Sequence, residues 1–119
     1  MIVAQISDTH ILPPESDQPA ASLRADCLRR CVADINRQRP DVVVFTGDPV
    51  QHGRPDEYAR LRELLDPLEV PLFIGPGNRD DKRALRAAFH DCDYLAATNE
   101  FLHYAVDDYD VRLVGVDST

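Results

Sequence analysis

Three short apolar segments divide the first two thirds of the chain. They lie at residues 1–7, 42–45 and 70–74. The middle one, Val42-Val-Val-Phe45, is apolar at every position, which is typical of a strand covered on both faces, as in a parallel sheet. We therefore expect three strands here. Two later apolar segments, at 101–106 and 111–116, are separated by an acidic turn and predict two further strands.

In the sequence between these segments, the apolar residues recur at the spacing of a helix. Between residues 22 and 38 the apolar side chains form one helical face. The members of this face are Leu23, Cys27, Leu28, Cys31, Val32 and Ile35. Two more helices are expected at 55–65 and 81–89, the first opening with a proline followed by two acidic residues, which suits a helix N-terminus. The proline-rich segment 13–19 predicts an exposed loop.

This order of elements predicts an α/β fold. A strand followed by a helix occurs three times, and two strands come after them. Such alternation indicates a mostly parallel sheet with right-handed crossovers. In sheets of this kind the binding crevice lies outside the carboxyl ends of the strands.

Polar residues that can bind metal follow each of the three predicted strands. Asp8 and His10 follow the first, Asp48 the second, and Asn78 the third. Each group alone has an ordinary explanation as a turn residue or a helix cap. Together they offer hard oxygen and nitrogen ligands at one edge of the sheet. A pair of metal ions needs a bridging carboxylate and terminal ligands. Asp48 suits the bridge, Asp8 and His10 suit one metal, and the Asn78 carbonyl suits the other.

Composition narrows the range of partners. The chain has 119 residues, the size of one domain, and carries 21 acidic against 13 basic residues, a formal net charge of −8. This balance argues against binding nucleic acid through bulk charge, although metal ions would still allow a small phosphate substrate.

No apolar stretch is long enough to span a bilayer, and the N-terminus lacks signal-peptide features, so we expect a cytoplasmic protein. The three cysteines are expected to be buried as small apolar side chains.

The motifs resemble those of a known family. Asp8-x-His10, Gly47-Asp48 and Gly77-Asn78-x-Asp80 are similar to the opening half of the calcineurin-like metallophosphoesterase signature. Further resemblance to the bacterial branch of glycerophosphodiesterases and class III cyclic-nucleotide phosphodiesterases comes from four segments. They are Ile6-Ser-Asp-Thr-His10, Gly53-Arg-Pro-Asp-Glu-Tyr58, Pro76-Gly-Asn78 and Ala105-Val-Asp-Asp108.

The resemblance implies the N-terminal half of an αββα sandwich and hydrolysis of a glycerophosphodiester or cyclic nucleotide. It implies hydroxide attack at a binuclear site holding iron, manganese, zinc or cobalt. By position, Asp8 and His10 would hold the first metal, Asp48 would bridge, and Asn78 would hold the second.

Two departures from the family pattern stand out. Arg79 occupies the position of the family's histidine after the asparagine, and the later Gly-His-x-His element is missing. We therefore expect residues 1–119 to be a single metallophosphoesterase domain truncated before the C-terminal histidine motifs and inactive by itself. Arg79 is expected to contact phosphate, since Arg binds phosphate oxygens but is no general acid at neutral pH. Asp80 is expected to steady Arg79, and Asp81 to cap the next helix.

The remaining histidines are interpreted by position. His52 follows Asp48 in a strand-end loop and is a candidate substrate contact. His90 and His103 are expected to be structural.

Two other functions stay open. Gly75-Pro-Gly77 between a strand and a helix resembles part of the dinucleotide fingerprint, but Asp80 stands where its last glycine belongs and would repel a pyrophosphate. Alternatively, the chain is a non-catalytic fragment that acts as an interaction module. In either case a sheet face left uncovered by helices predicts self-association into a homo-oligomer.

Overall fold

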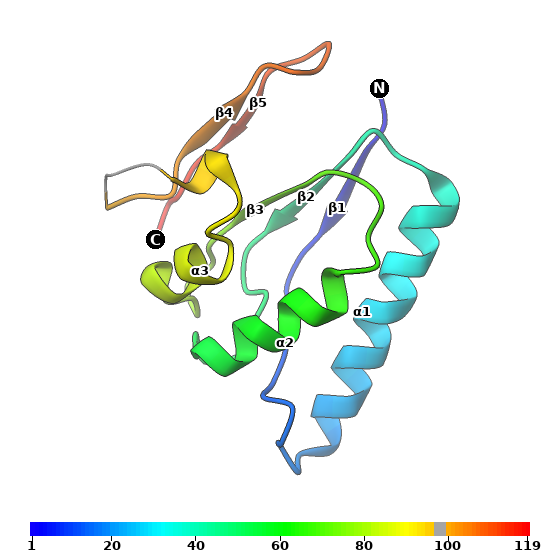
Figure 1. Ribbon diagram of the computed structural model, residues 1–119, viewed down its shortest axis with the longest axis vertical. Coiled ribbons are helices and arrows are strands. Elements are labelled where there is room, and N and C mark those ends of the chain that lie inside the picture. The colour runs from blue at the N-terminus through cyan, green and yellow to red at the C-terminus, as the bar shows by residue number, and fades with distance from the viewer. Residues whose placement is uncertain (97–99) are drawn as a thin grey trace.

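A three-stranded parallel sheet forms the centre of the molecule (Figure 1). The computed structural model describes residues 1–96 and 100–119. Strands β1 (Val3–Ile6), β2 (Val42–Thr46) and β3 (Leu72–Gly75) pair in the order β1-β2-β3. Because all three run in the same direction, their carboxyl ends lie at one edge of the sheet. The expected α/β fold with a parallel sheet is confirmed.

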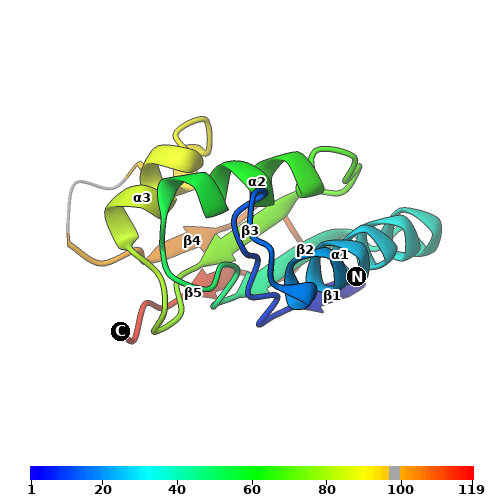
Figure 2. The ribbon, with the colours of Figure 1, turned by 90° about the horizontal axis from the view of Figure 1, so that it is seen from below.

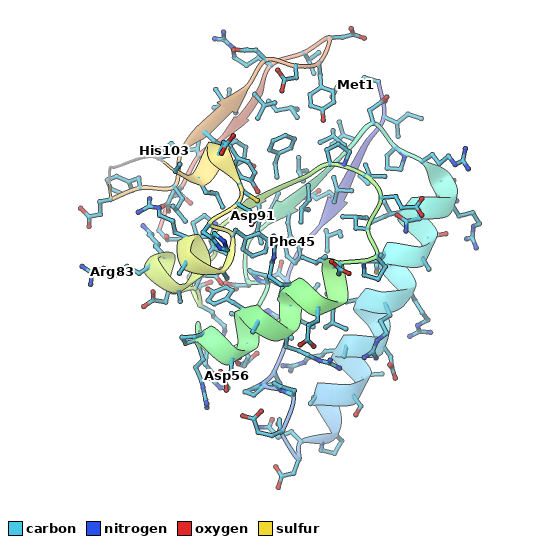
Figure 3. The ribbon with its side chains drawn as sticks, viewed as in Figure 1. Met1, Phe45, Asp56, Arg83, Asp91 and His103 are labelled. Atoms are coloured by element: carbon cyan, nitrogen blue, oxygen red, sulfur yellow. The ribbon has the colours of Figure 1, made fainter. Side chains whose placement is uncertain are left out.

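Helices connect the strands and cover one face of the sheet (Figure 2). They are α1 (Pro19–Gln38), α2 (Pro55–Leu65) and α3 (Lys82–Ala88), followed by a 3-10 turn, η1 (Asp93–Leu95). The core residues of all three helices belong to one buried cluster with Val43 and Phe45 of β2. In Figure 3 Phe45 lies in the interior between sheet and helices, while Arg83 points outward from α3.

An antiparallel hairpin of β4 (Tyr104–Val106) and β5 (Leu113–Gly115) follows η1. Tyr104 of this hairpin belongs to an aromatic group on the face of β3 away from the helices. In this group the ring centroid of Phe73 lies 4.9 Å from that of Tyr94 and 6.0 Å from that of Tyr104. The part of this face formed by β1 is less covered, since Val3 is 45% exposed. The helices therefore bury one side of the sheet, and the hairpin covers only part of the other.

Several boundaries differ from the sequence-based expectations. Helix α1 begins at Pro19, three residues earlier than expected, because proline fits the first helical position, where its missing N–H is not needed. Pro13, expected in an exposed loop, is buried. Four of the five strands in the described part of the chain are shorter than the apolar segments that predicted them, whereas β2 extends one residue further, to Thr46. The predicted cap of α3 is confirmed, since the Asp81 side chain accepts a hydrogen bond of 2.8 Å from the Ala84 amide.

The expectation for the cysteines was wrong at two of the three positions. Cys27 and Cys31 are exposed, and Cys92 is partly buried. The buried stripe of α1 consists of Ala25, Leu28 and Val32, which is narrower than the apolar stripe in the sequence. Both cysteines lie outside this buried stripe. Within residues 1–96 and 100–119, no helix combines the length and apolar character that crossing a bilayer would demand.

Candidate metal centre

The segments after β1 and β2 bring three metal-binding side chains together. One ligand atom each from Asp8, His10 and Asp48 lies within 4.8 Å of the others. Backbone hydrogen bonds hold this arrangement. The Asp8 amide donates to the Gly47 carbonyl and the His10 amide to the Asp48 carbonyl, both at 3.1 Å. The pairing of the two strands thus continues past their ends and fixes the spacing of the three side chains.

All three residues adopt an unusual backbone conformation. Their φ angles are 56° for Asp8, 46° for His10 and 49° for Asp48. The one other non-glycine residue with positive φ in the described part of the chain is Arg39, which ends α1. Left-handed conformations are unfavourable for residues with a side chain and concentrate at functional sites. Three of them at adjacent strand ends mark this edge of the sheet as a candidate functional site.

His10 provides a test of whether a cation fits here. Its Nδ1 atom is buried and has no hydrogen-bond partner among the described residues. Its Nε2 atom lies 3.6 Å from Oδ1 of Asp8. A buried polar atom without a partner is energetically unfavourable unless something else satisfies it. The Nε2 nitrogen of His10 beside the Asp8 carboxylate, with Asp48 close by, forms a donor set that suits Zn²⁺, Mn²⁺ or Fe²⁺.

The loop after β3 completes the edge of the site by packing against Asp48. The Arg79 amide donates a 3.0 Å hydrogen bond to Oδ1 of Asp48. At Gly77, an added Cβ would lie 2.2 Å from the same oxygen and 2.4 Å from the Asp48 amide nitrogen, so a side chain has no room. Asn78 is exposed on this loop, between the two residues that touch Asp48. Its role as a ligand stays a prediction.

Asp80 is hydrogen-bonded to α2 and to the loop backbone, and its expected contact with Arg79 stays a prediction. Its carboxylate accepts hydrogen bonds from the Tyr58 hydroxyl and from the Gly77 amide, each at 2.6 Å. Burial raises the pKa of Asp80, and these two hydrogen bonds act in the opposite direction. The Arg79 side chain is exposed, which leaves its guanidinium accessible to a ligand.

His52 is tied to the first turn of α2. Its Nδ1 lies 3.0 Å from Oε2 of Glu57, and its amide donates to Oε1 of the same residue at 2.9 Å. The Glu57 side chain is fully buried, whereas that of His52 is 52% exposed. If Nδ1 of His52 donates its proton to Glu57, Nε2 is the ring nitrogen available for a hydrogen bond to a substrate. That contact also stays a prediction.

The other two histidines have structural contacts, in agreement with the sequence. Nδ1 of His90 lies 3.2 Å from the Ala87 carbonyl at the end of α3. His103 accepts a 3.0 Å hydrogen bond from the Asp117 amide and stacks on Phe101.

The sequence analysis assigned no role at the site to three polar residues that are buried in the structure. Glu57 and Tyr58 support the segments around the site, and Asp117 is a buried carboxylate beyond β5. Glu57 and Tyr58 belong to the segment Gly53-Arg-Pro-Asp-Glu-Tyr58, which the family resemblance had already marked. No comparable signal distinguished Asp117.

Comparison with known proteins agrees with this geometry. The family model for calcineurin-like phosphoesterases matches residues 1–116. The chain is 36% identical over 124 residues to a probable glycerophosphodiester phosphodiesterase GpdQ of Arcobacter nitrofigilis, and 38% identical over 128 residues to the glycerophosphodiester phosphodiesterase GpdQ of Enterobacter lignolyticus. Each alignment covers 100% of this chain and 44% of the relative.

A third relative has a different substrate in its name. The 3′,5′-cyclic adenosine monophosphate phosphodiesterase CpdA of Pseudomonas aeruginosa is 31% identical over 97 residues, which cover 80% of this chain and 36% of the relative. The chain thus spans less than half the length of all three relatives.

Proposed function

Because this chain belongs to the calcineurin-like phosphoesterase family, we propose that it provides the N-terminal half of a metal-dependent phosphodiesterase site. The observation that carries the proposal is the convergence of Asp8, His10 and Asp48 within 4.8 Å, with a buried nitrogen of His10 unsatisfied. The proposed substrate is a small phosphodiester, either a glycerophosphodiester or a cyclic nucleotide. The names of the relatives support both classes.

The residues have distinct roles in this proposal. Asp8 and His10 hold one metal ion, Asp48 lies between two, and the carbonyl oxygen of Asn78 holds the second. Iron, manganese, zinc and cobalt all suit this set of oxygen and nitrogen donors. When bound, such ions supply Lewis acidity and lower the pKa of water toward neutrality.

The chain's own side chains then bind the substrate. The exposed guanidinium of Arg79 offers paired N–H donors to the phosphate oxygens. His52 is placed to add a second contact from the loop after Asp48. Asp80 acts on the loop backbone through Gly77 and does not itself reach the substrate.

A Mn²⁺ titration together with hydrolysis of bis(4-nitrophenyl) phosphate tests the proposal. We expect the chain to bind Mn²⁺ weakly, because it has few imidazole ligands, and Asp48→Asn to lower the affinity roughly tenfold or more. Asp66→Asn is the matched control, since Asp66 is an exposed carboxylate at the end of α2. Equal Mn²⁺ affinity in both variants would reject the metal site.

One observation favours a non-catalytic alternative. Nδ1 of His90 lies 3.2 Å from the Ala87 carbonyl, and Nδ1 of His103 accepts from the Asp117 amide. Because these ring nitrogens already have partners, both residues are poor candidates for the additional imidazole ligands that the family resemblance implies. If Mn²⁺-dependent release of 4-nitrophenolate is detected and is lost in Asp48→Asn, the enzyme is favoured. Mn²⁺-dependent binding of the diester without turnover would favour an interaction module.

A further inference from the structure

The loop that carries Asn78 is held in place from α2. The side chain of Tyr58, on the second turn of that helix, is fully buried. Its hydroxyl donates to Oδ1 of Asp80 at 2.6 Å and accepts from the Asp81 amide at 3.2 Å. One phenol oxygen therefore contacts both a side chain and the backbone of the loop.

The second oxygen of Asp80 extends this connection to the other side of Asn78. Oδ2 accepts a 2.6 Å hydrogen bond from the Gly77 amide, and the Asp80 amide donates to the Gly77 carbonyl at 3.3 Å. Asn78 lies inside the small ring that these bonds close. The chain of contacts thus runs from α2 through a hydroxyl and a carboxylate to the backbone immediately before Asn78.

The segment before α2 supports the same loop. At Gly53, φ is 71°, and an added Cβ would lie 2.7 Å from the Asp81 amide nitrogen and 3.1 Å from the Arg79 carbonyl oxygen. Close backbone packing on one side and a hydrogen-bonded phenol on the other leave the loop little freedom. A phenylalanine would fill the interior at position 58 equally well, so packing alone does not account for the hydroxyl.

We propose that Tyr58 is a positioning residue for the second metal ligand: through Asp80 it fixes the backbone around Asn78 and so sets the distance of Asn78 from Asp48. This inference rests on the proposed function, because it assumes that Asn78 binds metal. It assigns to Tyr58 a role that acts through the loop and does not involve contact with metal or substrate. Groups that orient metal ligands typically change metal affinity by 10- to 100-fold when they are removed.

Tyr58→Phe tests the proposal, with Tyr94→Phe as the matched control. The Tyr94 hydroxyl accepts a 2.9 Å hydrogen bond from the Ile74 amide in β3, so both changes remove one hydroxyl that bonds to this part of the chain. Only Tyr58 contacts the Asn78 loop. Two measurements on the whole chain are compared: hydrogen exchange of the Gly77 amide without metal, and Mn²⁺-induced broadening of amide resonances.

We expect Tyr58→Phe to speed exchange at Gly77 about tenfold and to raise the Mn²⁺ concentration needed to broaden Asn78 and Arg79 by about tenfold. Tyr94→Phe should leave both readouts at 77–79 as in the wild type. A second variant, Asp80→Asn, keeps an acceptor for Tyr58 but loses one for the Gly77 amide, and should reproduce the effect on Asn78 if Tyr58→Phe does not fold.

The outcomes separate this inference from the proposed function. If Mn²⁺ broadens no amide near Asp8, His10 and Asp48 in the wild type, the metal site is wrong and the role of Tyr58 falls with it. If the wild type responds but Tyr58→Phe and Tyr94→Phe change residues 77–79 equally, Tyr58 is a structural residue only. That result would overturn the inference and leave the metal site standing.

Discussion

Gly77 is the residue at which the loop after β3 comes closest to Asp48. Because an added Cβ would meet the backbone nitrogen as well as the carboxylate of Asp48, rotation of a side chain cannot relieve the clash. Gly77→Ala should lower the free energy of unfolding by about 1–3 kcal/mol and weaken Mn²⁺ binding roughly tenfold. Urea denaturation and a Mn²⁺ titration measure the two effects.

Gly75→Ala provides the comparison for this substitution. The nearest atom to a Cβ at Gly75 is the Phe45 carbonyl oxygen at 4.0 Å, so the methyl group has room. We expect a change within about 0.5 kcal/mol and unaltered Mn²⁺ affinity. Similar losses in both variants would show that the close approach at Gly77 is not what limits the loop.

Arg79 is the second residue whose chemistry can be tested directly. A histidine can donate a proton to a leaving oxygen, whereas a guanidinium offers charge but no usable proton at neutral pH. In a protein that also carries the later histidine motifs, Arg79→His should raise turnover in the Mn²⁺-dependent hydrolysis of aryl phosphodiesters roughly tenfold, with the larger gain for poor leaving groups. Turnover is measured across diesters of graded leaving-group pKa.

Arg83→His makes the same chemical change on α3, at an arginine that points outward (Figure 3). It should leave turnover as in the wild type. Should Arg79→His instead lower turnover, or leave it unchanged, for good and poor leaving groups alike, Arg79 is itself adapted to catalysis and the proposed role as a histidine replacement is wrong.

At the scale of elements, Asp117 joins the hairpin to the start of α3. Its buried carboxylate accepts hydrogen bonds from the Leu102 and Thr119 amides and lies 2.9 Å from Nζ of Lys82. Burial alone would raise the pKa of Asp117, but the Leu102 amide and the Lys82 ammonium outweigh it and hold the pKa well below its usual range. The charged carboxylate therefore stabilises the folded state.

The sign of the pH dependence follows from this lowered pKa. The stabilisation is complete above the ordinary carboxyl pKa of about 4 and is lost as the pH falls toward the lower folded-state value. Asp117→Asn should reduce the free energy of unfolding by about 2–3 kcal/mol at pH 7, since hydrogen bonds to charged groups are lost. The difference from the wild type should shrink below about pH 4. Denaturation at a series of pH values measures it.

Asp107→Asn is the surface control for this experiment. Asp107 pairs with Arg112 on the hairpin, and both side chains are more than half exposed. Exposed ion pairs contribute at most about 1 kcal/mol, so this variant should be nearly as stable as the wild type at neutral pH. A pH-independent loss in Asp117→Asn would contradict the assigned cause.

At the scale of the whole molecule, apolar side chains remain exposed on the side of the sheet away from the helices. Val114 and Val116 are 62% and 72% exposed, and together with Val44 they line a cavity of about 300 Å³ between the sheet and the hairpin. Apolar patches of this kind favour association. The isolated chain should therefore self-associate, and the double variant Val114→Lys, Val116→Lys should shift it toward monomer in light scattering.

Leu23→Lys tests whether the location of the charge matters. Leu23 is also 62% exposed but lies on α1. The Leu23→Lys variant should change the molecular mass distribution less than the double variant does. A wild-type chain that is a monodisperse monomer at moderate concentration would remove the basis for this prediction.

The sequence by itself determined the order of the elements and the strand ends at which polar residues gather. Helical and strand periodicity are local properties, so they can be read without knowing what lies nearby in space. The cap at Asp81 was predictable for the same reason, because a helix cap involves residues three positions apart. Parallel pairing then required that Asp8, Asp48 and Asn78 lie at one edge.

Only the tertiary structure decided how those residues meet. The positive φ angles at Asp8, His10 and Asp48 depend on hydrogen bonds between segments about 40 residues apart, which no local pattern encodes. The partner of Asp80 is likewise set by the packing of α2 against the loop after β3. The exposure of Cys27 and Cys31 depends on which face of α1 packs into the core. Contacts between distant segments are fixed by packing of the whole molecule, and for this reason the sequence predicted which polar residues gather at the strand ends but not the bonds that hold them.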